Sequence, residues 1–79
     1  MMNFQLTEKF INTIQSLIKS RNDAKIKSIL SSFFPQDIAE IISALNISEG
    51  KYLFELLKDS SPEILIELED NLREEILSG

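Results

Sequence analysis

Cysteine and histidine are both absent from this sequence of 79 residues. Without them the chain can form no disulfide, offers no thiol nucleophile, and lacks the imidazole on which many zinc, haem and acid–base sites depend. The sequence also contains no glycine-rich phosphate loop, and no histidine base is present to activate its serines as nucleophiles. These absences predict that the protein is not an enzyme.

Long apolar runs are missing as well. No stretch approaches the ~20 apolar residues that cross a bilayer, and the first residues lack the basic region and the cleavage site of a signal peptide. The absence of cysteine fits a reducing compartment. We therefore expect the protein to be cytoplasmic.

Charge is distributed unevenly along the chain, whose net charge is −5. Residues 1–34 carry five basic side chains against two acidic ones, whereas residues 35–79 carry three basic against eleven acidic side chains. An acidic surface repels the phosphates of nucleic acids, so nucleic acid is not expected as a partner. The acidic half instead favours a cation or a basic surface.

Apolar residues recur at helical spacing throughout the chain, and no strand-like alternation is present. The central stretch begins with a proline at position 35, which suits the first turn of a helix, and continues with apolar residues on one face. These are Ile38, Ile41, Ile42 and Leu45. Because this helix is apolar around most of its circumference, other elements must cover it. The expected helices are residues 8–20, 23–33, 35–45 and 49–58 and the region from 62 to 77.

Residues that favour helix N-termini precede these segments. Thr7 is expected to cap the first helix, Asn22 or Asp23 the second, and Ser48 the fourth. Gly50 should weaken the first turn of the fourth helix by up to ~1 kcal/mol relative to alanine.

Two arrangements are open for the last segment. In one continuous helix, Ile66 and Leu77 would lie on the acidic side, opposite the other apolar residues. A break near Asp70 would instead let each half turn its own apolar residues inward. We favour two short helices, which gives five to six helices in the whole chain.

Short loops join these helices, so successive helices should be near-antiparallel neighbours. A proline followed by an acid and apolar residues occurs at 35–38 and again at 62–65. This weak echo predicts short helices stacked side by side, as in helical-repeat superhelices, rather than a long four-helix bundle. We expect one α-helical module over residues 1–79.

Several segments together resemble a known family. The most specific is Phe-Pro-Gln-Asp-Ile-Ala-Glu-Ile-Ile at residues 34–42, followed by Phe-Glu-Leu-Leu at 54–57 and Leu-Arg-Glu-Glu-Ile-Leu at 72–77. With residues 17–23 before them, they resemble the N-terminal cytosolic domain of the MgtE family of magnesium transporters. That domain is a right-handed superhelix of short helices, which precedes a pair of CBS domains and a membrane channel. The resemblance implies the same fold here, in a fragment of a longer N-terminal domain.

Glu63, Glu67, Asp70 and Glu74 are spaced so that one continuous helix would carry them as a single stripe. Like charges at this spacing repel by a few tenths of a kcal/mol per pair, which a divalent cation would relieve. Mg²⁺ needs only one or two protein carboxylates because it keeps most of its waters. These four residues are therefore candidate ligands for a weakly held Mg²⁺, and the alternative is a solvated acidic face.

The family resemblance implies a regulatory, Mg²⁺-sensing domain that docks on CBS domains through bridging cations. Glu63 takes the position of an acid that faces those domains. The expected partners are the CBS domains and the membrane domain of the parent transporter, and a second copy of the chain in a homodimer. The alternative is a helical-repeat adaptor for protein–protein interactions, similar to flagellar motor switch modules, with no ion role.

Four aromatic side chains, at Phe33, Phe34, Tyr52 and Phe54, are expected in the core. The alternative is a docking patch that no neighbouring helix covers. The basic side chains at positions 19, 21, 25 and 27 are expected to be solvated, because no aromatic is interleaved among them as in surfaces that bind nucleic acid.

Overall fold

The computed structural model describes residues 7–78, and every regular element in that range is helical. The order is α1 (Glu8–Lys19), α2 (Asp23–Leu30), α3 (Pro35–Ala44), α4 (Ile47–Leu56), the 3-10 turn η1 (Lys58–Ser60), α5 (Ser61–Glu67) and α6 (Asp70–Leu77). The prediction of an all-α fold with five to six helices is thus confirmed. Within the described range, no helix is long and apolar enough to cross a membrane.

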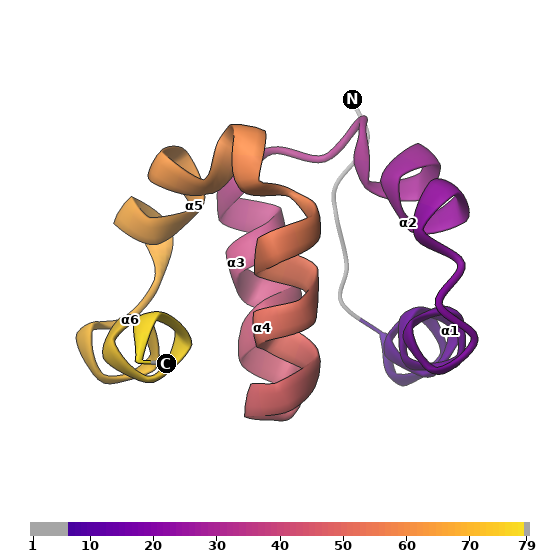
Figure 1. The fold of residues 1–79 in the computed structure, drawn as a ribbon, viewed down its shortest axis with the longest axis horizontal. Helices are drawn as coiled ribbons and strands as arrows, with labels where there is room; N and C mark the ends of the chain where they lie inside the picture. Colours follow the sequence, from indigo (N-terminus) through magenta and orange to yellow (C-terminus); the bar gives the residue numbers. More distant parts are fainter. Residues whose placement is uncertain (1–6, 79) are drawn as a thin grey trace.

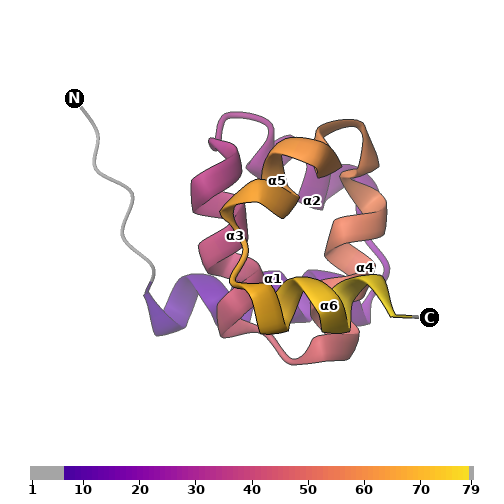
Figure 2. The ribbon, with the colours of Figure 1, turned by 90° about the vertical axis from the view of Figure 1, so that its left-hand side faces the viewer.

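The helices stack as three pairs (Figure 1). α3 and α4 form an antiparallel central pair, with α1 and α2 on one side of it and α5 and α6 on the other. α4 packs against both α1 and α6, and α3 packs against α5. Figure 2 shows that α1 and α6 run in the same direction, across the central pair rather than along it. The stacking of short helices is as predicted, and the right-handed turn of the stack stays a prediction.

One apolar core holds the three pairs together, and among the described residues it buries no polar or charged side chain. The central helix α3 contributes most to it, which confirms that the other elements cover this helix. The core residues are Ile14, Ile18, Ile26, Leu30, Ile38, Ala39, Ile41, Ile42, Leu45, Leu53, Ile64, Leu68 and Ile76.

The first two helices begin as predicted. Thr7 Oγ1 accepts a hydrogen bond from the Phe10 amide at 3.1 Å, and Asn22 Oδ1 accepts one from the Lys25 amide at 3.3 Å. α2 ends at Leu30, three residues earlier than position 33. Phe34 precedes a proline and is extended, with ψ 157°, because the proline ring disfavours the helical conformation of the residue before it. The chain therefore turns before α3.

The start of α4 differs from the prediction, because Asn46 and not Ser48 is its cap. Asn46 Oδ1 accepts from the Glu49 amide at 2.8 Å, and Glu49 Oε1 accepts from the Asn46 amide at 3.1 Å. This reciprocal pair is a capping box, which satisfies two backbone donors at once. The helix accordingly begins at Ile47, two residues before the predicted start.

Gly50 lies where α4 is packed most tightly. A Cβ at this position would lie 3.2 Å from Ile42 Cγ2 on α3 and 3.2 Å from Ile76 Cδ1 on α6. The weak helix former therefore has a packing role, since it lets two neighbouring helices approach α4 closely.

The break near Asp70 is confirmed, with α5 ending at Glu67 and α6 beginning at Asp70. The prediction that each half would then turn its apolar residues inward is wrong for two residues, because the side chain of Ile66 is 74% exposed and that of Leu77 is 57% exposed. Each short helix packs through one face only, and no described element covers the opposite side of either helix at these positions.

The aromatic residues divide between core and surface. Phe33 stacks on Phe10, with ring centroids 5.7 Å apart, and Tyr52 and Phe54 are half-buried against the core. Phe34 is 70% exposed, so its expected place in the core is wrong. Its extended conformation at the start of α3 turns the ring away from the helices.

Candidate functional site: charged end faces and grooves along α4

The four predicted magnesium ligands are all exposed, but they belong to two helices. Glu63 lies in the first turn of α5 and Glu67 at its end, whereas Asp70 opens α6 and Glu74 follows one turn later. Because the break separates the two halves, the four do not form the single stripe of a continuous helix. Among the described residues, no group of three or more acidic side chains is placed to hold a metal ion.

Arg73 is the cation within this acidic region. Its Nη2 lies 2.5 Å from Asp70 Oδ1, and its Nη1 donates to the Leu65 carbonyl at 3.4 Å. Arg73 thus ties the first turn of α6 to the last turn of α5 and neutralises one of the four candidate ligands. Glu63, Glu67 and Glu74 have no ion-pair partner among residues 7–78.

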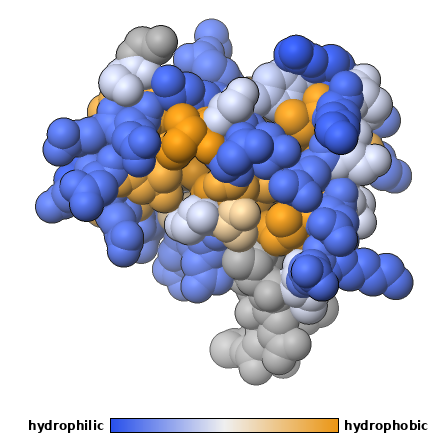
Figure 3. Space-filling model, turned by 90° about the horizontal axis from the view of Figure 1, so that it is seen from below, coloured by the Kyte–Doolittle hydropathy of each residue, from blue (hydrophilic) through white to orange (hydrophobic). Residues whose placement is uncertain are grey.

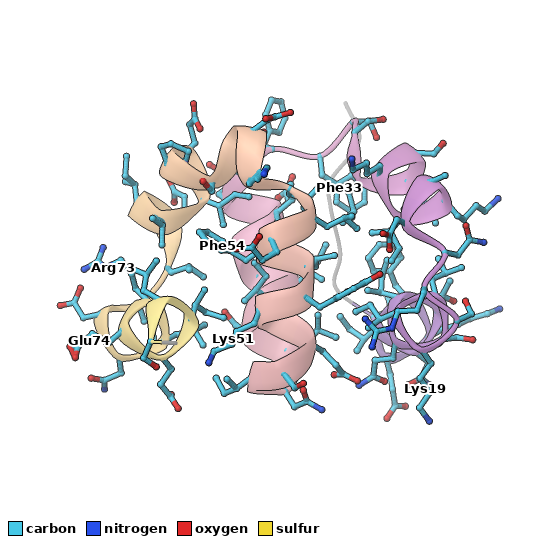
Figure 4. The ribbon with its side chains drawn as sticks, in the orientation of Figure 1. Lys19, Phe33, Lys51, Phe54, Arg73 and Glu74 are labelled. Carbon is cyan, nitrogen blue, oxygen red and sulfur yellow. The ribbon has the colours of Figure 1, made fainter. Side chains whose placement is uncertain are left out.

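Open grooves run beside α4. One separates it from α1 and the following turn, has a volume of about 580 Å³, and includes Lys19, Arg21, Tyr52 and Glu55 in its walls. Another, of about 290 Å³, separates α4 from α6 and is more apolar. Figure 4 shows Lys51 and Phe54 on the side of α4 that faces α6. Seen from below, the surface is mostly hydrophilic, with hydrophobic residues exposed between the hydrophilic ones (Figure 3).

The turn between α1 and α2 is held in an unusual way. The Asn22 amide donates to the Leu17 carbonyl at 3.0 Å and the Arg21 amide to the Ile18 carbonyl at 3.1 Å, which is the Schellman pattern. Glycine usually occupies the left-handed position of this motif, but here Arg21 does, with φ 58°. For a residue with a Cβ that conformation costs roughly 1–2 kcal/mol, so other contacts must hold it.

Tyr52 on α4 supplies such contacts. The Arg21 guanidinium lies 5.1 Å from the centroid of the Tyr52 ring, and the Tyr52 hydroxyl donates to Asp23 Oδ1. The hydrogen bond to Asp23, followed by desolvation, raises the pKa of Tyr52 above its usual value. The three side chains join the first turn of α2 to the middle of α4.

These long-range polar contacts were not predicted from the sequence. Besides the Tyr52–Asp23 pair, Gln15 Nε2 donates to Glu49 Oε1 at 3.1 Å, and Lys51 Nζ donates to the Ser78 carbonyl at 2.7 Å. One local signal was available, because an asparagine three residues before a glutamate is typical of a capping box and would have placed the Glu49 carboxylate. No spacing along the chain indicates which side chain Glu49 or Tyr52 meets on another helix.

Comparison with known proteins identified no relative of this chain. No family model, no curated protein and no solved structure matches the chain. The fold and surface themselves define a small stack of helices with exposed charged ends.

Proposed function

We propose that this protein is a helical docking module, and that the acidic α5–α6 pair is its docking surface. The observation that carries the proposal is the exposure of Glu63, Glu67 and Glu74 without ion-pair partners in the described part of the chain, beside exposed Ile66 and Leu77. An apolar centre with a polar rim is typical of protein–protein interfaces.

The partner that we favour is an acidic surface held through Mg²⁺. This follows the resemblance to the MgtE N-terminal domain, whose CBS domains would face α5 and α6 in a cytoplasmic, Mg²⁺-sensing part of a transporter. A shared site agrees with the finding that no group of three or more acidic side chains among the described residues is placed to hold a metal ion. Mg²⁺ retains several waters and is bound through one or two carboxylates, so each of two facing acidic surfaces would need to supply only one.

Titration of the ¹⁵N-labelled protein with MgCl₂ tests this proposal. We expect shifts at α5 and around Glu63 with a dissociation constant in the millimolar range or weaker, since half of the site is absent. Glu63→Gln should reduce these shifts, and the matched change Glu40→Gln on α3 should leave them intact. Saturable binding at micromolar Mg²⁺ by the isolated chain would contradict a shared site.

An adaptor without an ion role is the second candidate, and the exposed Phe34, Ile66 and Leu77 favour it. The two candidates differ in one measurement, which is binding to a pair of CBS domains from an MgtE-type transporter. The magnesium-bridged module should bind them only when Mg²⁺ is present and should release them on addition of EDTA. The adaptor should show no such dependence.

A further inference from the structure

The two outer pairs of the stack carry opposite charges. The segment Glu8–Leu30, which forms α1 and α2, holds five basic side chains against two acidic ones. The segment Ser61–Leu77, which forms α5 and α6, holds six acidic side chains against one basic. All of these charged groups are exposed except Arg73, which is half-buried.

The fold places these charges at opposite ends. The central pair lies between α1–α2 and α5–α6, so the basic and acidic ends face away from each other along the stack (Figure 1). Figure 4 shows Glu74 on the outer side of α6. Lys19 and Arg21 line the groove beside α4, so Lys9, Lys25 and Lys27 are the exposed basic side chains that remain for the α1–α2 end. Because the stack separates the two ends, the basic side chains of one molecule cannot neutralise its own acidic end.

We propose that copies of this chain associate head to tail, with the acidic α5–α6 end of one copy on the basic α1–α2 end of the next. Charge complementarity identifies a second copy of the chain as the partner, because the basic surface that would neutralise the acidic α5–α6 end is present on α1–α2 of the same protein. Contact between two identical ends would instead bring like charges together. Among the described residues of the two outer pairs, the exposed large apolar side chains are Ile66 and Leu77 at the acidic end.

A contact between unlike ends leaves one free end of each kind, and it therefore extends into an open stack rather than a closed dimer. The contact joins chiefly exposed charged side chains, and exposed ion pairs contribute little each, so the association should be weak and reversible. It should also depend on salt, since exposed charges are screened over a Debye length of about 10 Å at 0.1 M.

This inference rests on the proposed function, because both use the α5–α6 surface. Sedimentation velocity of the full chain at increasing protein concentration, in about 20 mM and then about 500 mM NaCl, is the first test. We expect species larger than a dimer at low salt and high concentration, and monomers at high salt. A monomer at millimolar protein in low salt would overturn the inference.

Charge-reversed variants test the direction of the contact. Glu67→Lys/Glu74→Lys changes the net charge of α5–α6 from −5 to −1 and removes most of the attraction. Lys25→Glu/Lys27→Glu changes that of α1–α2 from +3 to −1, so this end repels the acidic end. Each variant alone should therefore associate at least ~10-fold more weakly. A mixture of the two variants restores one native interface per pair, and it should give a one-to-one dimer. A mixture that stays monomeric, or a variant that associates as the wild type does, would overturn the head-to-tail contact.

The matched control is Glu40→Lys/Glu55→Lys, which changes the net charge as Glu67→Lys/Glu74→Lys does but on the central pair. It should associate like the wild type, and an equal loss would show that net charge and not the end faces controls association. A wild type that stays monomeric yet binds CBS domains with Mg²⁺ overturns only the inference. A wild type that associates but never binds them overturns only the magnesium-bridged function.

Discussion

The α1–α2 pair and the α5–α6 pair flank the same two central helices, yet different contacts hold them there. Side-chain caps begin both α1 and α2, and hydrogen bonds from Gln15 and Tyr52 link this end to α4. α5 and α6 have no side-chain cap and depend on a few buried side chains, chiefly Ile64 and Ile76. Lys51 and Arg73 also donate hydrogen bonds to backbone carbonyls at this end. Short helices without side-chain caps can therefore be held by packing and a few such bonds, but with apolar side chains left exposed.

The largest expected effect comes from removing packing at the end that relies on it. Ile64 is fully buried between α5 and the rest of the core, so Ile64→Ala should cost about 2–4 kcal/mol of unfolding free energy through lost contacts and a cavity. Urea denaturation measures the loss. Ile66→Ala is the control on the same helix, since Ile66 is 74% exposed and should change stability by less than about 0.5 kcal/mol. Equal costs would mean that α5 packs through a different face.

The next effect concerns the close approach of α6 to α4. Gly50→Val places a branched side chain where even a Cβ lies 3.2 Å from Ile42 and Ile76, and overpacking of this kind costs about 1–3 kcal/mol. Gly50→Ala should cost much less, because the gain of up to ~1 kcal/mol in helix propensity offsets the tighter contact. Amide exchange should show α6 losing protection before α1. If α1 and α6 lose protection equally, the two ends are not independent.

The two ends also differ in helix capping. Thr7→Ala removes the hydrogen bond to the Phe10 amide and should cost about 1 kcal/mol. Glu69 occupies the cap position of α6 but makes no such bond, so Glu69→Ala should stay within about 0.5 kcal/mol. Thermal unfolding of the two variants, side by side, measures the difference. A larger loss for Glu69→Ala would show that α6 has a cap in solution.

The smallest expected effect is a pH dependence of the unfolding free energy, which arises from the Tyr52–Asp23 contact at the α1–α2 end. The Tyr52 pKa is raised above 10.0, first by the hydrogen bond to Asp23, so the folded state holds the phenolic proton more tightly than the unfolded chain. This contribution to stability is complete below about pH 10 and is lost as the pH rises through the folded pKa. Urea midpoints from about pH 8 to pH 11 should therefore fall more steeply in the wild type than in Tyr52→Phe, which shares the titration of the lysines. Parallel curves would show that the Tyr52–Asp23 contact is not formed.

Local chemistry explains which parts of the fold were predictable. Pro35 fixes the start of α3, Thr7 and Asn22 cap the first two helices, and the acids around Asp70 mark the break between α5 and α6. These features depend on residues within one helical turn of each other, so they can be predicted from the sequence.

The rest depends on contacts between helices. The exposure of Phe34, Ile66 and Leu77 follows from where the neighbouring helices end, which periodicity does not report. The candidate metal site meets the same limit. Spacing predicts one stripe for Glu63, Glu67, Asp70 and Glu74 only in a continuous helix, and the break between α5 and α6 and the Arg73–Asp70 pair divide them.

α4 has a consequence for communication across the molecule. Ile76 of α6 packs against α4 at Gly50. Two residues later, Tyr52 contacts Arg21 and Asp23 in the turn after α1. A slight rotation of α4 would disturb both contacts together, because each depends on which side of the helix faces its neighbour.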